Sequence, residues 1–205
     1  MTFDQAEFDI RCEWGEQGIV RLAPISDVVI IVDVISFSTS VTVAAAPPGT
    51  RLVLPSPNGA TLTLATKNTA TLAGCFRNAK AVATATMRYG PRVAVIPAGE
   101  RWREDGTLRP AYEDLIGAGA IICHLRGTLS PEARLAASAF LGLQNDLLTN
   151  LMDCSSGKEL REIGYEEDIR LCAELDADDI APVLMDGAYR KAEPIRIDRS
   201  GKEQP

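Results

Sequence analysis

The run VVIIVDV at residues 28–34 limits the fold more than any other feature of this sequence. A strand that is apolar at nearly every position has both faces covered by other elements, as parallel strands in α/β proteins do. Ser36, Ser38 and Thr39 follow it, and their hydroxyls can cap a helix built from SVTVAAA. The segment therefore predicts a buried strand, a polar turn and a helix.

Further strands are expected at 51–54, 80–83 and 92–96, each after a probable helical segment. Strands that alternate with helices imply right-handed crossovers and helices on both faces of the sheet. The C-terminal half is helical by pattern. Helices are predicted over 112–125, from a Ser130-Pro131-Glu132 cap through Leu151, from a capping box at 156–159 to Gly164, and from Glu166 to Glu174, before a frayed tail from Lys191.

We therefore predict a three-layer α/β/α fold with a largely parallel or mixed central sheet, and one domain over residues 1–205. One connection is too short for this topology. Between Val34 and Arg51 the chain must leave a strand, build a helix and return, although such a crossover usually takes at least a dozen residues. We expect residues to be missing between Ala46 and Pro47.

Composition excludes several classes of protein. Lys and Arg total 21 against 28 Asp and Glu, so a net charge of -7 argues against nucleic acid as a partner. The longest apolar run is too short to cross a membrane, and the acidic N-terminus does not resemble a signal peptide, so a cytoplasmic protein is expected.

The five cysteines form no C-x-x-C motif and are interpreted as reduced core thiols. His124 is the only histidine and lies in an apolar run, which favours a structural imidazole over a catalytic base.

Carboxylates beyond the strand ends are therefore the main candidates for chemistry, because ligands of open α/β sheets bind there. Asp33 ends the first buried strand, where an ionised carboxylate is costly without a cation or several donors. Capping the next helix is its alternative role. Ser38 and Thr39 at the helix start could hold an anion beside it.

A second polar turn is Ser56-Pro57-Asn58-Gly59. Asn-Gly is a strong hairpin signal, but Pro55 and Pro57 would remove strand hydrogen bonds, so a strand-to-helix loop is favoured. Such a loop would present Ser56, Asn58 and the Gly59 N–H to a ligand.

A third polar segment, containing Glu100 and Arg101, follows the strand at 92–96, and Glu113-Asp114 enters the next helix. Mg²⁺ prefers oxygen ligands with one or two carboxylates, and arginine matches phosphoryl oxygens in pairs. Taken alone, the acidic pair is more often explained by the dipole of its helix than by a metal site. Together with Asp33, these residues suit metal-assisted phosphate chemistry.

The segments VVIIVDVISFSTSVT, LVLPSPNGATL, CFRNAKAVA, VIPAGERW, DGTLRPAYEDLIGAGAII and CSSGKELREIGYEEDI occur in an order that resembles the 2-phosphosulfolactate phosphatase family (ComB-like). The resemblance runs from about Asp27 to Tyr189. It implies a three-layer α/β fold and a Mg²⁺-dependent phosphatase that converts 2-phosphosulfolactate to sulfolactate, a step in coenzyme M formation. A small phosphorylated acid is thus the expected substrate, and a homodimer is left open.

By matching position, the resemblance implies functional roles for Asp33, the Ser38-Thr39 hydroxyl pair, the Asn58-Gly59 turn and the Glu113-Asp114 acidic pair. We expect a metal site at Asp33, Glu113 and Asp114, with Asp33, Asp114 and Arg101 as catalytic residues. We expect substrate binding by Ser36, Ser38, Thr39, Ser56, Asn58, Gly59 and Glu100. Better-known members carry Arg-Ala where this chain has Ser36-Phe37, so Arg101 is expected to supply the guanidinium instead. Two alternatives stay open: an anion-binding homologue without turnover, and a hydrolase that uses Cys154 or His124.

Overall fold

The computed structural model describes residues 4–45, 54 and 56–191. In chain order the elements are β1 (Ile10–Cys12), α1 (Gly15–Leu22), β2 (Val28–Val32), α2 (Phe37–Ala45), α3 (Gly59–Ala65), β3 (Ala70–Gly74), α4 (Ala79–Thr86), β4 (Val93–Pro97), β5 (Glu100–Arg101), β6 (Leu108–Arg109), α5 (Tyr112–Ile122), α6 (Pro131–Leu143), α7 (Leu147–Asp153), α8 (Ser155–Glu162), α9 (Glu166–Cys172), β7 (Pro182–Met185) and β8 (Ala188–Lys191).

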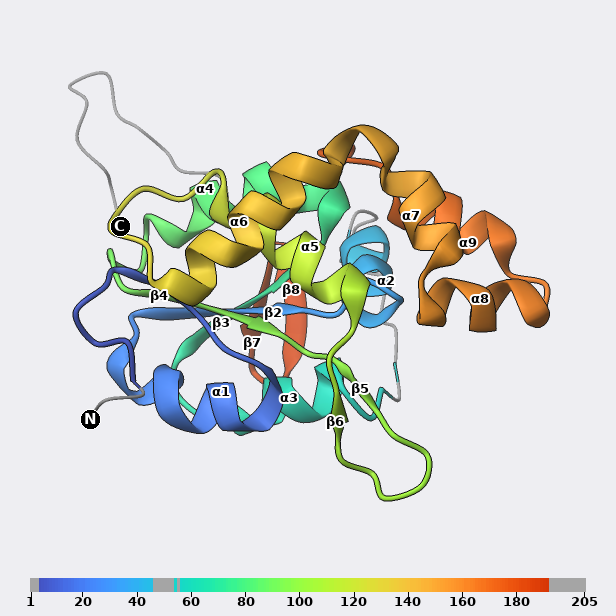
Figure 1. The fold of residues 1–205 in the computed structure, drawn as a ribbon. Coiled ribbons are helices and arrows are strands. Elements are labelled where there is room, and N and C mark those ends of the chain that lie inside the picture. Colours follow the sequence, from blue (N-terminus) through green and yellow to red (C-terminus); the bar gives the residue numbers. More distant parts are fainter. Residues whose placement is uncertain (1–3, 46–53, 55, 192–205) are drawn as a thin grey trace.

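The central sheet has the order β1-β4-β2-β3-β7-β8. The first four of these strands are parallel to one another, and β7 and β8 continue the sheet in antiparallel pairing. Helices α1 and α3 cover one face, and α4, α5 and α6 cover the other, while α7, α8 and α9 extend beyond one end of the sheet (Figure 1). The predicted three-layer α/β/α fold with a mainly parallel sheet is confirmed.

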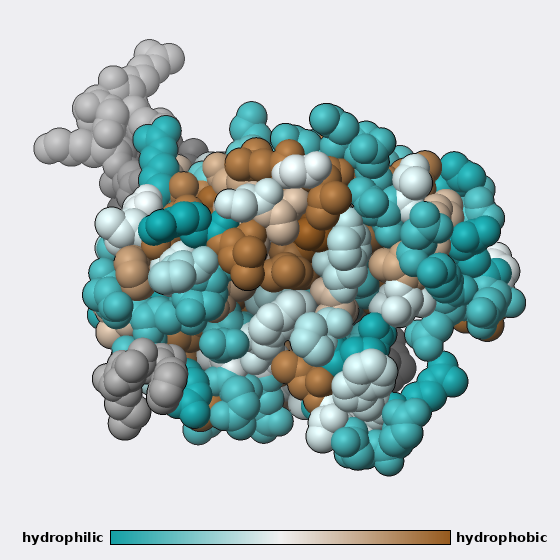
Figure 2. Space-filling view, in the orientation of Figure 1, coloured by the Kyte–Doolittle hydropathy of each residue, from teal (hydrophilic) through white to brown (hydrophobic). Residues whose placement is uncertain are grey.

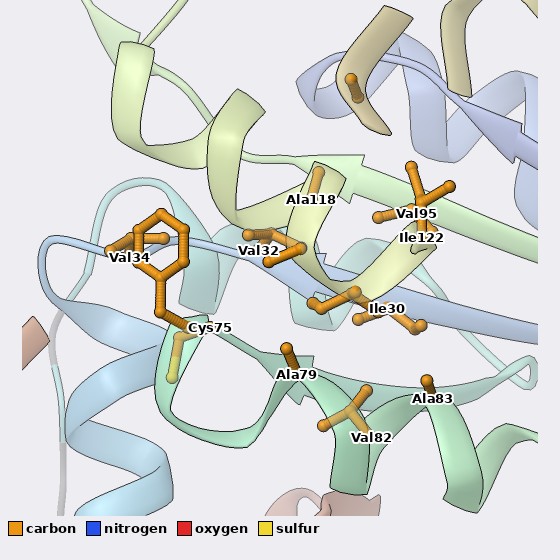
Figure 3. Close-up of a cluster of buried hydrophobic side chains, with 14 of the residues drawn as sticks. Ile30, Val32, Val34, Cys75, Ala79, Val82, Ala83, Val95, Ala118 and Ile122 are labelled. Atoms are coloured by element: carbon orange, nitrogen blue, oxygen red, sulfur yellow. The ribbon is translucent and has the colours of Figure 1, made fainter. Parts of the chain in front are cut away.

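Strand β2 shows why a continuous apolar run folds this way, since all five of its residues are buried. Val28, Ile30 and Val32 belong to the core beneath α4, α5 and α6, whereas Val29 and Ile31 belong to the core beneath α1 and α3. Alternate side chains of a strand point to opposite faces, so both faces must be apolar. Figure 3 shows the first of these cores, with side chains of β2 and β4 directed toward α4 and α5.

Two glycines of α5 let the helix pack closely. A Cβ at Gly119 would lie 2.1 Å from the Ala136 carbonyl oxygen of α6, and one at Gly117 would lie 2.6 Å from Val34. Real Cβ atoms do not approach so closely. The glycines that weaken this helix in isolation are therefore explained by its neighbours.

Several predicted elements are wrong in place or in kind. Residues 80–83 lie inside α4 rather than in a strand, and the third parallel strand is β3 instead. Helix α6 is capped by the Ser130 hydroxyl, which accepts from Ala133 N as expected, but a 3-10 turn at 144–146 separates it from α7. Helix α8 is capped by Cys154 rather than by Ser156. The antiparallel β7 and β8 interrupt the predicted helical half.

Other expectations concern residues outside the described ranges. The gap expected between Ala46 and Pro47, nearly all of the tail, and all but the last residue of the strand predicted at 51–54 lie there. Within the described ranges no helix is long and apolar enough to span a membrane, and all five cysteines are free. Apolar surface gathers over α6, where Leu135 and Leu141 are exposed, and the surface around the β5–β6 hairpin is more polar (Figure 2).

Candidate active site

Acidic side chains from three segments meet at one edge of the sheet. Asp33 follows β2, Glu100 follows β4 after a short turn, and Glu113 and Asp114 lie in the first turn of α5. Strands β2 and β4 are parallel neighbours, so their carboxyl ends share this edge. The charge of Asp33 acts on Asp114 and Glu100, and the charge of Glu113 acts on all three other carboxyls. The predicted convergence of Asp33 with Glu113 and Asp114 is present.

Asp114 ties the two strand-end loops together. Its Oδ1 accepts from Val34 N at 2.8 Å, and its Oδ2 accepts from Gly99 N at 2.8 Å. The side chain is only 3% exposed, and burial, followed by the charges of Asp33 and Glu113, raises its pKa well above the usual range. Asp114 is thus a structural acceptor that fixes the loops around it.

Asp33 bonds to the starts of two helices. Its Oδ1 accepts from Phe37 N at 3.2 Å, and its Oδ2 accepts from Gly59 N at 2.9 Å and from the Ser56 hydroxyl at 3.4 Å. Burial raises its pKa, and these hydrogen bonds act in the opposite direction. Capping and proximity to the other acids therefore both hold for this side chain. The helix expected after the 56–59 turn is confirmed because Gly59 begins α3, whereas most of the strand expected before it lies outside the described residues.

The hydroxyl residues after β2 fall into two groups. The Ser38 hydroxyl donates to Ile31 O and accepts from Asp33 N, and the Thr39 hydroxyl donates to Val34 O. Both side chains are buried and bond to the backbone of the turn. Ser36 is exposed at the tip of the same turn. The structure therefore leaves Ser36 accessible and uses Ser38 and Thr39 to hold the turn in shape.

Glu100 is partly exposed to solvent, whereas Asp33, Glu113 and Asp114 are buried. Its Oε2 accepts from Asn58 Nδ2 at 2.7 Å. Burial raises its pKa to about 7, with the charges of Asp33 and Glu113 adding to the effect and Asn58 and Arg109 opposing it. A carboxyl that titrates near neutral pH suits proton transfer.

The β5–β6 hairpin separates its two arginines. Glu100 pairs with Arg109, and Arg101 pairs with Leu108. Residues directly opposite in an antiparallel pair share a face, so Arg109 lies on the face of Glu100. Arg101 lies on the other face, donates to Gly106 O at 3.0 Å and lines a hollow of about 240 Å³ beside the start of α1, which Asn58 and Glu100 also line. Arg101 as the source of the guanidinium stays a prediction, and Arg109 is a second candidate that sequence reasoning missed, although the Asp105-Gly106 turn signal could have given the register.

Neither alternative nucleophile is suited to catalysis here. His124 follows the C-terminal end of α5, on the order of 15 Å along the helix from Glu113, and its Nε2 lies 3.3 Å from Asp176 Oδ2. Cys154 is near the site, but burial together with the Glu113 charge raises its thiol pKa to about 12. A protonated thiol is a poor nucleophile. The acidic cluster is therefore the better chemical centre.

The donor set allows a test of whether Mg²⁺ fits. Within residues 4–45, 54 and 56–191, no group of three or more Asp, Glu, His or Cys side chains is arranged to hold a metal ion. Mg²⁺ commonly takes only one or two carboxylates, with water and phosphate completing its octahedron. Asp33 and Glu113 fit that role, since a carboxylate oxygen retains acceptor capacity after one hydrogen bond. Asp33 and Asp114 each have both oxygens bonded to backbone amides, but burial and neighbouring charges raise the pKa of Asp114 well above its usual range, so Asp114 fits the role less well.

Comparison with known proteins bears on this geometry. The family model described as 2-phosphosulpholactate phosphatase matches residues 45–187. The chain belongs to the 2-phosphosulpholactate phosphatase family. The matched range includes Glu100, Arg109, Glu113 and Asp114. Asp33 precedes the matched range, and the fold brings it close to Glu113 and Asp114.

Individual relatives carry the same family name. A "Probable 2-phosphosulfolactate phosphatase" of Pseudothermotoga lettingae is 31% identical over 121 residues, which cover 58% of this chain and 51% of that protein. A protein of the same description from Caldanaerobacter subterraneus is 29% identical, with 58% of this chain and 49% of the relative covered. The aligned part of the chain thus spans about half the length of these 2-phosphosulfolactate phosphatase relatives.

Proposed function

We propose that this protein is a phosphomonoesterase for a small acidic phosphate ester, with 2-phosphosulfolactate as the first candidate substrate and sulfolactate and phosphate as products. Membership of the family and the names of its relatives support this proposal. Because the relatives are only half covered, their activity comes to this chain as part of the proposal.

The observation that carries the proposal is the unpaired acidic cluster. Asp33, Glu113 and Asp114 are 4%, 2% and 3% exposed and lie close enough to repel one another. Among the described residues, the salt bridges involve other acids and none of these three. Buried like charges are costly unless a cation joins them. A divalent cation that also binds phosphoryl oxygens would supply that charge.

In the proposed mechanism Asp33 and Glu113 would hold Mg²⁺, which would supply charge neutralisation at the phosphoryl oxygens. Asp114 keeps the two loops in register through its bonds to Val34 N and Gly99 N. Ser38 and Thr39 fix the turn after β2. Ser36 and Ser56 are proposed to contact the phosphoryl group, since the Ser36 side chain is exposed and the Ser56 hydroxyl bonds to Asp33 and is partly exposed.

Glu100 is proposed as the proton donor to the leaving oxygen. As the P–O ester bond breaks, its electron pair goes to the ester oxygen, and the Glu100 proton converts that oxygen to the alcohol. Water adds to phosphorus in the overall hydrolysis. A pKa of about 7 keeps a sizeable protonated fraction at neutral pH, and the Asn58 amide orients the carboxyl group.

Release of inorganic phosphate tests the function. The protein should release phosphate from 2-phosphosulfolactate in MgCl₂ and lose that activity in EDTA. Phosphorylated hydroxy acids without a sulfonate serve as the comparison panel. Tight binding of the ester without release of phosphate, with Mg²⁺ present, would instead support an anion-binding homologue and contradict the proposal.

A further inference from the structure

Arg109 is the arginine of the β5–β6 hairpin that shares a face with Glu100. Its strand partner is Glu100, whose pKa its positive charge lowers. Arg101 pairs with Leu108 on the opposite face and lines the hollow beside α1 together with Asn58 and Glu100. The alternation of side chains along β5 and β6 places Arg109 on the face of Glu100, where its charge acts on that carboxyl.

The Arg109 side chain packs on an aromatic ring and forms no salt bridge with any described residue. Its Cζ lies 5.8 Å from the centre of the Trp102 ring, a cation–π distance, and the side chain is half-buried. Within the described part of the chain it forms no salt bridge or hydrogen bond. A guanidinium supported on one side by an aromatic ring keeps its donors free for an anion.

Arg109 is less buried than the carboxyls at which the ester bond would break. The three most buried carboxyls are at most 4% exposed, whereas Trp102, on which Arg109 lies, is 50% exposed. A substrate whose phosphoryl group sits at the buried acids would direct its remaining part outward along the Glu100–Arg109 face. That outer part carries the second acidic group of the expected substrate.

We propose that Arg109 binds the carboxylate or sulfonate of the substrate that is not transferred, and so selects esters with a second acidic group. The inference rests on the proposed function, because it assumes that a phosphoryl group occupies the buried acids. Planar guanidinium groups pair with carboxylates through two parallel hydrogen bonds and bind sulfonate oxygens by the same donors. Arg109 is a specificity-determining residue in this account, and the proton donor remains Glu100.

Steady-state kinetics with two substrates test this role. Arg109→Ala should raise KM for 2-phosphosulfolactate by about 10- to 100-fold, the range for losing hydrogen bonds to a charged group, with little change in kcat. The same variant should leave kcat/KM for p-nitrophenyl phosphate, which has no second acid, within about 3-fold. Arg109→Lys should restore part of the lost affinity. Arg103→Ala, which removes an exposed cation from the same hairpin, is the matched control and should change neither substrate.

Calorimetric binding separates this proposal from the proposed function. Sulfolactate, which lacks a phosphoryl group, should bind the wild-type protein and lose at least about 10-fold in affinity in Arg109→Ala. If the protein releases no phosphate but binds sulfolactate in this Arg109-dependent way, the phosphatase proposal fails and the Arg109 proposal stands. Equal losses for both esters, a selective loss in Arg101→Ala instead, or no binding of sulfolactate to the wild type would each overturn the role of Arg109.

Discussion

Gly59 gives the sharpest steric test of the site, because its missing side chain leaves room for Asp33. It begins α3, and its N–H donates to Asp33 Oδ2 at 2.9 Å. A Cβ there would lie 2.3 Å from Phe37 Cδ1 and 2.8 Å from Asp33 Oδ2. Phe37 is buried and makes an edge contact with Tyr189 at 6.1 Å, so the ring has little freedom to retreat. Gly59→Ala must therefore displace Asp33, Phe37 or the start of the helix.

The expected cost follows from that overlap. Extra methyl groups in packed interiors destabilise by about 1–3 kcal/mol, and this one also strains a buried hydrogen bond. We expect Gly59→Ala to lower the free energy of unfolding by about 2–3 kcal/mol. A shift of about 1 Å in a catalytic group can reduce turnover by about 100-fold, so phosphate release should fall by that order in the folded variant.

Urea denaturation followed by circular dichroism measures the first effect, and phosphate release from 2-phosphosulfolactate measures the second. Gly142→Ala is the matched control, since a Cβ at this position in α6 meets nothing within 4 Å. It should stabilise the protein by about 0.5–1 kcal/mol and leave turnover unchanged. If Gly59→Ala unfolds at the wild-type urea concentration and keeps full turnover, the described packing around Asp33 is wrong.

Three further predictions concern buried polar groups. Asp114→Ala leaves two buried amides without an acceptor, so urea unfolding should show a loss of about 2–6 kcal/mol, and Asp114→Asn a smaller one. The pKa of Glu100 is about 7 in the folded protein and 4.5 in an unfolded chain, so the folded state stays protonated to a higher pH than the unfolded state. The free energy of unfolding of the wild type in EDTA should therefore fall as pH rises from about 4.5 to 7. Glu100→Gln should remove about 1–2 kcal/mol of that fall, a figure reduced for solvent screening, and an unchanged pH profile would contradict the burial of Glu100. Asn78→Ala removes bonds to Thr42, Ala73 and Ile180 and should cost about 3 kcal/mol in the same assay, whereas a cost under about 1 kcal/mol would refute that network.

The sequence signals that succeeded are local ones. A run of apolar residues identified β2, and a Ser-Pro-Glu cap with an apolar stripe identified α6. The mistake at β3 has a packing cause. A Cβ at Gly74 would lie 2.6 Å from Ile121 and 2.9 Å from Ile30, so the strand needs a small residue there, and its ATLAG sequence lacks the bulky residues that mark a strand.

In the candidate site, too, local sequence signals identified some residues, and others depend on the three-dimensional fold. Asp33, Glu100 and the Glu113-Asp114 pair could be predicted because each follows a strand or enters a helix at the carboxyl edge of the sheet. Arg109 could not be found that way, since its orientation depends on the register of two-residue strands in the hairpin. The inward bonds of Ser38 depend likewise on the three-dimensional path of the turn rather than on residue type.

The rate of phosphate release by Asp33→Asn tests the central claim most directly. Asn keeps one carbonyl acceptor and nearly the same shape but removes the charge that would hold the cation. With Mg²⁺ and 2-phosphosulfolactate, Asp33→Asn should keep the wild-type circular dichroism spectrum and lose at least about 1,000-fold in kcat, a loss of the size seen when a principal electrostatic contact is removed. Asp146→Asn, at an exposed position, is the control and should retain wild-type kcat. Full turnover by folded Asp33→Asn would show that catalysis does not depend on the acidic cluster at the ends of β2 and β4.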